Sequence, residues 1–294
     1  MKHLGSPTCF LGIQLERTDS GFLIHQADLI DRILQRFGVT DVEPALTPMD
    51  PKIKFDKCMS GSPSFHGEYR HAVGCLQYLV TCSRPDIAAP VSIVSAYNAA
   101  PTVAHWEALL RVLAYLKGTC TIGLSFSKSP HVPSGLVGFA DSTWGSDVSS
   151  RRSRTGFFFR LNGHLVSWQS KLQPTVALST CEAEYMALSS AVQESAFLLQ
   201  FITSVVFHPI RTALIHQDNK GTLDLAKNPR IKSRTKHIDI KHHFLREKLA
   251  SGQICLRFTP TADMQADILT KPLVVAEFLR QRDSMGMLEF ALNS

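Results

Sequence analysis

The sequence lacks the features by which several large classes of protein are recognised. Its seven cysteines are scattered and no two are spaced as Cys-x-x-Cys, which argues against a zinc ribbon and a disulfide framework and favours a reducing compartment. No apolar run approaches the ~18 residues that a membrane-spanning helix requires. The N-terminal run CFLGIQL is short and is broken by Gln14. We therefore expect no signal peptide, no transmembrane segment and no membrane partner.

The composition is otherwise that of an ordinary globular protein. The chain has 294 residues, of which 44% are hydrophobic and 19% charged, enough for two domains or one large one. A formal charge of +6 mildly favours a polyanionic partner. A slightly basic enzyme surface would explain the same charge, so both alternatives stay open at this point.

The first part of the chain predicts a small α+β piece followed by helices. Residues 9–16 and 22–26 alternate as two strands, and 27–37 have helical spacing that ends at Gly38. The stretch 40–55 contains three prolines and predicts an extended linker. Three helices are then expected at residues 68–83, 87–100 and 103–118.

After a second linker at 127–135 the pattern becomes that of an α/β domain. An apolar strand at 135–140 precedes two strands that flank Asn162-Gly163, the dipeptide typical of a tight hairpin. A long helix then runs from Ser179 to about Val205. Two further strands are expected at 212–217 and 253–258, with helices between them and a last helical segment around Asp267. The first, fourth and fifth strands should be parallel neighbours, whose carboxyl ends form sites.

Four acids are candidates for such a site. They are separated by roughly 35 to 50 residues, a spacing set by whole structural units. Carboxylates gathered at one end of a sheet repel one another unless they are protonated or bridged by cations. Oxygen ligands of this kind suit Mg²⁺ or Mn²⁺, and two such ions can hold both sides of a phosphoryl displacement. The candidates are Asp141, Glu184, Asp218 and Asp267.

The motifs around these acids resemble one known family. FADSTWGSDVSSRRSRTGFFF, LSTCEAEYMAL, IHQDNKGTLDLAKNP and PTADMQADILTKPL are similar to the RNase H domain of copia-type LTR retrotransposon polyproteins, over residues 136–273. Upstream, FLGIQL, YRHAVGCLQYLVTCSRPDIAAPVS and HWEALLRVLAYLKGT resemble the end of the reverse transcriptase and the connection that follows it. The resemblance implies an α/β protein with an RNase H-like mixed five-stranded sheet and flanking helices. It divides the chain into a reverse-transcriptase remnant with linker (1–58), a helical connection (59–130), an RNase H domain (131–275) and a C-terminal tail (276–294).

The function that this resemblance implies is hydrolysis of the RNA strand of RNA/DNA hybrids. Two Mg²⁺ ions, or Mn²⁺, would be held by the four acids. The family's first acid falls on Asp141, its Asp-Asn motif on Asp218 and the acid of ADILTK on Asp267. Thr143 stands where the family often has a second, non-catalytic acid, and Asp263 is interpreted as a loop or capping residue. The implied partners are the hybrid and the remainder of the Pol polyprotein, in the cytoplasm (in a virus-like particle) or the nucleus.

Two acids compete for the role on the long helix. Ser179 followed by Glu182 fits a capping box, in which Glu182 at N3 reaches back to the N-cap amide. RNase H domains generally place the metal-binding Glu before an apolar pair and an Ala, as in Glu184-Tyr185-Met186-Ala187. We therefore assign Glu184 to the site and Glu182 to the cap.

Basic residues flank the acid-bearing strands. As clusters they are candidates for phosphate contacts, and singly each is explained as a solvated charge. Trp144 and Trp168 are interpreted as core or rim packing rather than as stacking platforms. The basic candidates are Arg151, Arg152, Arg154 and Lys171, and the run Arg230, Lys232, Arg234 and Lys236.

Two departures from related enzymes leave alternatives. Cellular RNases H carry a His before the last helix, whereas PTADMQ has none; His237, His242 and His243 are interpreted as surface residues of a helix. No Asp-Asp dipeptide, the polymerase signature, occurs in the chain, so we expect no polymerase activity from it alone. The alternatives are a catalytically inactive remnant that at most binds nucleic acid, and an integrase-type transferase, which the early position of the Glu disfavours.

Overall fold

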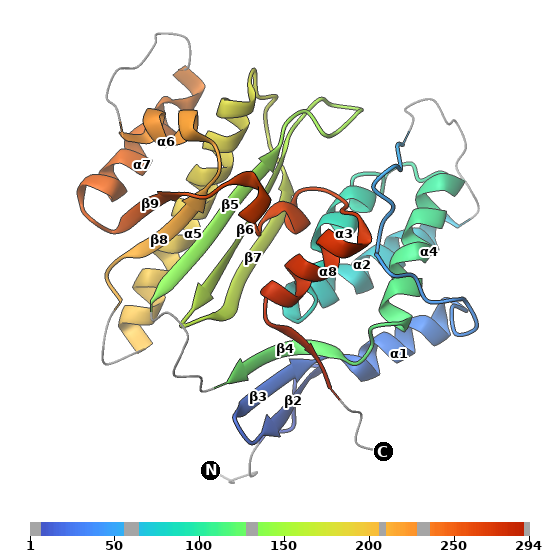
Figure 1. Ribbon diagram of the computed structural model, residues 1–294. Helices are drawn as coiled ribbons and strands as arrows, with labels where there is room; N and C mark the ends of the chain where they lie inside the picture. Colours follow the sequence, from blue (N-terminus) through green and yellow to red (C-terminus); the bar gives the residue numbers. More distant parts are fainter. Residues whose placement is uncertain (1–6, 56–64, 128–134, 206–209, 228–235, 291–294) are drawn as a thin grey trace. The chain divides into compact units, whose positions relative to one another are not determined.

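The computed structural model describes residues 7–55, 65–127, 135–205, 210–227 and 236–290, with the side chains of 236–242 excepted. The chain forms two compact units (Figure 1). Unit 1 comprises Met1–Pro130 and Pro272–Ser294, and unit 2 comprises His131–Lys271. Within the described ranges, no helix is both long and apolar enough to cross a membrane.

Unit 1 contains an antiparallel five-stranded sheet in the order β1-β2-β3-β4-β10. The first predicted strand is divided in two by a turn at Leu11 and Gly12, where both residues have positive φ. The strands are β1 (Cys9–Phe10), β2 (Ile13–Thr18), β3 (Gly21–His25), β4 (Ile122–Ser127) and β10 (Met287–Glu289).

The helices of unit 1 follow the predicted apolar spacing closely. The longest of them bury continuous apolar stripes, with Leu76 and Leu79 in one and Leu109, Val112 and Leu113 in another. The helices are α1 (Ala27–Arg36), α2 (His66–Cys82), the 3₁₀ turn η1 (Pro85–Ile87), α3 (Ala88–Ser95), α4 (Val103–Lys117) and α8 (Val275–Ser284).

Unit 2 contains a mixed five-stranded sheet in the order β7-β6-β5-β8-β9. Its first three strands are antiparallel neighbours, whereas β5, β8 and β9 are parallel, as predicted. Asn162 and Gly163 both have positive φ, which is the geometry of the predicted two-residue hairpin turn. The strands are β5 (Leu136–Thr143), β6 (Arg154–Leu161), β7 (His164–Leu172), β8 (Ala213–Gln217) and β9 (Ile254–Phe258).

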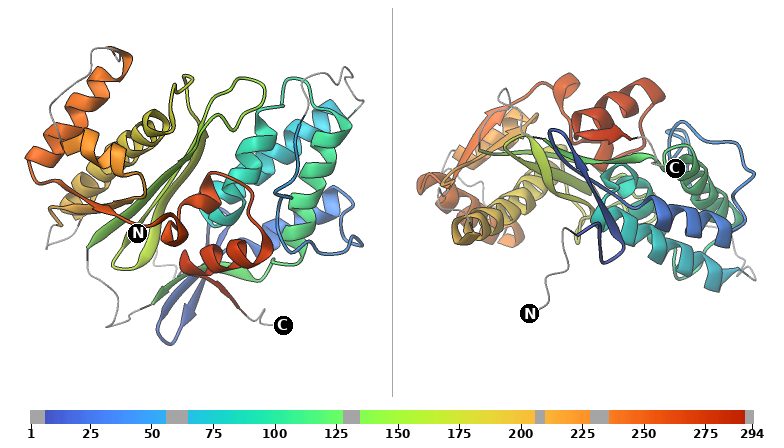
Figure 2. Two further views of the ribbon diagram at one scale, coloured as in Figure 1. Left: turned by 45° about the horizontal axis from the view of Figure 1, so that its top comes forward. Right: turned by 90° about the horizontal axis from the view of Figure 1, so that it is seen from below.

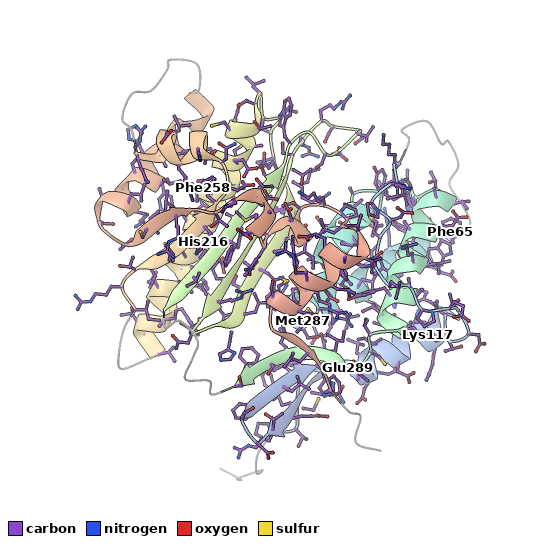
Figure 3. All side chains as sticks on the ribbon, in the orientation of Figure 1. Phe65, Lys117, His216, Phe258, Met287 and Glu289 are labelled. Carbon is purple, nitrogen blue, oxygen red and sulfur yellow. The ribbon has the colours of Figure 1, made fainter. Side chains whose placement is uncertain are left out.

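A long helix, α5 (Thr180–Val205), packs on β5 and β6 across one face of the sheet, as two further views also show (Figure 2). Phe157 and Phe159 of β6 join Tyr185 and Leu188 of α5 in the core of the unit. On the other face of the sheet His216 of β8, labelled in Figure 3, stacks on Phe139 with ring centroids 4.5 Å apart. The remaining elements are α6 (Lys220–Lys227), α7 (Lys236–Ala250) and the 3₁₀ turns η2 (Thr261–Asp263) and η3 (Asp267–Leu269).

Four elements differ from the sequence prediction. β4 was not predicted, and α8 and β10 lie in the segment predicted as a C-terminal tail. β10 pairs with β4, and Phe278 of α8 meets the ring of Tyr115 of α4 edge-on at 5.5 Å. This segment therefore completes the sheet and core of unit 1. Asp267 lies in a 3₁₀ turn rather than in a longer helix.

Candidate metal and active site

Three of the predicted acids meet at the carboxyl ends of β5 and β8. Asp141, Glu184 and Asp218 each offer a carboxylate oxygen, and these three oxygens lie within 4.8 Å of one another. Asp141 and Glu184 are 4% and 7% exposed, respectively. Asp267, which begins η3, is also buried, but the described coordinates do not bring it within this distance of all three.

The strand register explains how the acids come together. The β5 ladder with β8 ends at the pair Phe139 and His216, whereas the ladder with β6 continues to Thr143. Asp141 therefore lies two residues beyond the last parallel pair on β5, and Asp218 lies two residues beyond it on the β8 side. Asp218 directly follows β8. Glu184 is in the second turn of α5, where it faces the same end of the sheet.

A glycine allows η3 to approach the sheet. Gly156 of β6 is the register partner of Asp141. A Cβ atom at Gly156 would lie 2.6 Å from Cγ2 of Thr270 and 2.8 Å from Cβ of Leu269. The missing side chain thus leaves room for the turn that carries Asp267 and Thr270. Because the turn packs this closely on β6, Thr270 can hydrogen bond with the carboxylate of Asp141.

Each carboxylate of the group of three has a fixed neighbour. The Thr270 hydroxyl donates to Asp141 Oδ2 at 2.7 Å, and the Thr261 hydroxyl donates to Asp218 Oδ2 at 2.8 Å. The backbone N–H of Ser142 donates to Glu184 Oε1 at 3.3 Å. The other oxygen of Glu184, Oε2, is buried and has no hydrogen-bond partner among the described residues. A buried, unpaired carboxylate oxygen is costly unless a cation or proton satisfies it.

The pKa values of Asp141 and Glu184 reflect the burial and close spacing of the acids. Burial, and after it the charges of Glu184 and Asp267, raise the pKa of Asp141 well above its ordinary value. Burial and the charge of Asp218 raise the pKa of Glu184 to about 8. Three close carboxylates, two of them buried with raised pKa values and one with an unsatisfied oxygen, fit a hard divalent cation such as Mg²⁺. The donor set therefore suits the metal that the resemblance implies.

The second acid of the helix lies elsewhere. Glu182 accepts a hydrogen bond from the backbone N–H of Leu178 at 2.8 Å, and its own N–H donates to the Ser179 hydroxyl at 3.1 Å. Glu182 therefore has the predicted cap role, except that its carboxylate reaches the N–H one residue before the N-cap. It is not a member of the group of three.

Only some of the basic residues predicted to contact phosphate lie together on one surface of unit 2. Arg152 and Lys171 line one groove of about 660 Å³, and Arg151 is exposed. Arg154 is 3% exposed. Arg230, Lys232 and Arg234 lie outside the described residues, as do the side chains of Lys236, His237 and His242; His243 is exposed on α7. Trp144 is 52% exposed and donates from its indole Nε1 to the Ala177 carbonyl at 3.0 Å.

Sequence reasoning missed the residues that support the acids. Thr270, Thr261 and Gly156 carry no signal that separates them from other threonines and glycines. Lys271 is different, because it follows Asp267 at the i,i+4 spacing of a helical ion pair. Its Nζ lies 2.6 Å from Asp267 Oδ1.

The raised pKa of Glu184 predicts an unusual pH dependence of stability without divalent cations. The folded protein binds the Glu184 proton more tightly than the unfolded chain does. Its contribution is therefore fully present below the ordinary pKa of 4.5 and is lost as pH rises toward about 8. We expect the free energy of unfolding of wild type, relative to Glu184→Gln, to fall with pH by up to about 1.4 kcal/mol per unit.

Urea unfolding in EDTA from pH 5 to 8 measures this difference. The comparison with Glu184→Gln is needed because burial lowers the pKa of His216, which gives a slope of opposite sign. Mg²⁺ should reduce the loss by neutralising the carboxylate. Parallel profiles for the two proteins in EDTA would contradict the raised pKa.

Comparison with known proteins identifies the family to which this chain belongs. No family model matches the chain. The chain is 35% identical over 297 residues to the retrovirus-related Pol polyprotein from transposon TNT 1-94 of Nicotiana tabacum, which covers 98% of this chain. It is also 39% identical over 194 residues to the uncharacterized mitochondrial protein AtMg00810 of Arabidopsis thaliana, covering 66% of this chain and 79% of that protein. The chain belongs to the retrovirus-related transposon Pol polyproteins.

Membership of this family confirms the resemblance seen in the motifs. The chain spans 22% of the length of the TNT 1-94 polyprotein. Among solved structures, the chain is similar to RNase H1 from the halophilic archaeon Halobacterium salinarum, at 15% identity and a TM-score of 0.35, covering 46% of this chain and 93% of that one. The strand order and the helix on β5 and β6 confirm the predicted fold class, an RNase H-like mixed five-stranded sheet with flanking helices.

Proposed function

We propose that this Pol polyprotein segment is an RNase H-type endonuclease that hydrolyses the RNA strand of an RNA/DNA hybrid. The observation that carries the proposal is the group of three carboxylates, whose oxygens lie within 4.8 Å of one another at the carboxyl ends of two parallel strands. The metal ligands are Asp141, Glu184 and Asp218, with Asp267 as the fourth acid. Two Mg²⁺ ions, or Mn²⁺, are the proposed cofactor.

The chain's own residues supply the arrangement for this chemistry. When bound, the cations would supply positive charge to stabilise the phosphoryl group and to lower the pKa of an attacking water. Thr270, Thr261 and the Ser142 amide hold the carboxylates in fixed orientations, which lowers the cost of assembling the site. The unpaired Oε2 of Glu184 is the ligand atom that the described protein leaves unsatisfied.

We place part of the substrate contact in the groove lined by Arg152 and Lys171. The groove lies between α5 and the end of β7. Its cations Arg152 and Lys171 suit a phosphate backbone, and the acid in the same lining, Glu194, accepts a hydrogen bond from the Ser167 hydroxyl at 2.6 Å. Gln173, also in its lining, is 2% exposed, and its Oε1 has no hydrogen-bond partner among the described residues. Gln173 is therefore buried beneath the groove and is not proposed as a substrate contact. Arg154 is too deeply buried to join this surface as it stands.

The purified chain tests the function directly. With Mg²⁺ it should cleave the RNA strand of a labelled RNA/DNA hybrid, leave single-stranded RNA of the same sequence intact, and lose activity in EDTA. Binding of metal without any cleavage would instead favour the inactive-remnant alternative.

Replacing Arg152 and Lys171 together by Ala should weaken hybrid binding rather than remove the metal site. Each lost phosphate contact reduces the slope of log K against log salt by about 1, so we expect a reduction of about 1 to 2. Fluorescence anisotropy of a labelled hybrid across a salt series in Ca²⁺ measures the slope. Lys248→Ala, at a lysine paired with Glu247 on α7, is the control. An unchanged slope would remove the groove from the substrate path.

A further inference from the structure

A lysine forms an ion pair with Asp267, the fourth acid of the proposed site. Lys271 closes the turn that begins at Asp267, and its Nζ donates to Asp267 Oδ1 at 2.6 Å. The side chain of Lys271 is 39% exposed and that of Asp267 is 12% exposed. The pair is therefore shielded from water on the Asp267 side, where an ion pair is stronger than at a surface.

Lys271 interacts with more than its direct partner. Burial alone would lower its pKa, but the hydrogen bond to Asp267 and the charges of Asp267, Asp141 and Asp218 raise it. The same turn carries Thr270, which donates to Asp141, so Lys271 and Thr270 fasten the turn to two different carboxylates.

We propose that Lys271 is a built-in counter-ion of the carboxylate site, a positioning residue that neutralises Asp267 when no divalent cation is bound and competes with that cation for Asp267. The inference rests on the proposed metal site but goes beyond the four acids. Two cations that share one carboxylate repel each other, so the ammonium weakens metal binding while keeping the metal-free turn in place. Removing the positive charge should therefore tighten metal binding and loosen the metal-free protein.

The test uses the full chain, with Mn²⁺ as the probe and electron paramagnetic resonance to count the free ion. Lys271→Met removes the charge and keeps most of the aliphatic stem, Lys271→Arg keeps the charge, and Lys248→Met is a matched control at an ion-paired lysine on α7. We expect Lys271→Met to bind Mn²⁺ at least about fivefold more tightly than wild type. Lys271→Arg and Lys248→Met should bind it as wild type does.

Thermal unfolding separates a counter-ion from a merely structural lysine. Lys271→Met should melt below wild type in EDTA, and the deficit should shrink in saturating Mg²⁺, because a ligand that binds more tightly stabilises the variant more. A deficit of equal size in both conditions, or unchanged or weaker Mn²⁺ binding, would overturn the proposal. Lys271→Gln carries the same expectations if the Met variant fails to fold.

The outcome is distinct from that of the proposed function. Wild type that binds Mn²⁺ but does not cleave hybrid would remove the nuclease assignment, while tighter binding by Lys271→Met would still support the counter-ion. Conversely, wild type that cleaves hybrid while Lys271→Met binds Mn²⁺ no more tightly would leave the nuclease intact and reject the role of Lys271.

Discussion

Glu184→Gln is expected to remove magnesium-dependent hybrid cleavage, whereas Glu182→Gln should keep it. The change at Glu184 replaces the carboxylate of a proposed metal ligand by a neutral amide of the same size, and the Oε2 of that carboxylate is buried and unpaired in the described structure. Losing one ligand of a metal site should cost more than the 10–100-fold that loss of a supporting residue typically costs, so we expect a decrease of at least about 100-fold. Glu182 is bonded to the Leu178 amide at the helix start, and its loss should cost about 1 kcal/mol of stability.

The two variants form a matched pair on one helix, two residues apart and both buried. Initial cleavage rates in Mg²⁺, with the melting temperature of each protein as a check on folding, measure the effect. Asp141→Asn changes a second proposed ligand and should behave as Glu184→Gln does, with hybrid binding retained. Loss of cleavage in Glu182→Gln together with normal cleavage in Glu184→Gln would reverse the assignment.

The site was more predictable from the sequence than the supporting structure around it. Acids that follow parallel strands must meet at one edge of the sheet, so Asp141 and Asp218 could be paired from strand patterns alone. The choice of Glu184 over Glu182 depended on recognising a capping box, and the structure separates the two side chains in that sense. The contacts of Thr270 and Thr261 could not be predicted, because they depend on how two short 3₁₀ turns pack on the sheet.

The missed elements of unit 1 have different physical causes. β4 carries a usable signal, since Ile122, Leu124 and Phe126 alternate with small residues. β10 has three residues, too few for a periodicity, and it becomes a strand only because β4 offers a free edge. α8 buries little beyond Phe278 and Gln281, so its sequence resembles that of an exposed tail. The secondary structure of β10 and α8 therefore depends on contacts with distant residues rather than on local sequence preference.

Arg84→Met is expected to lower the stability of unit 1 by about 3 to 5 kcal/mol. Arg84 is fully buried and donates from Nε and Nη2 to the two carboxylate oxygens of Asp86, at 3.0 and 2.7 Å. It also donates to the carbonyl and hydroxyl of Thr119, at 2.9 and 2.7 Å. Without the guanidinium, the buried Asp86 carboxylate keeps only the Tyr115 hydroxyl among the donors to it in the described structure. An uncompensated buried charge then destabilises the folded state far more than the lost contacts do.

Urea unfolding of the single and double variants tests this account. Arg84→Met combined with Asp86→Asn should be more stable than Arg84→Met alone, because the second change removes the stranded charge. Arg111→Met is the control, since Arg111 is half-buried and bonds only to Thr47 in the described structure, at 3.3 and 3.1 Å; it should lose about 1 kcal/mol. If the double variant were less stable than Arg84→Met, the cost would lie in the lost hydrogen bonds rather than in the charge of Asp86. If Arg84→Met and Arg111→Met lost equal stability, the buried pair would contribute no more than an ordinary polar contact.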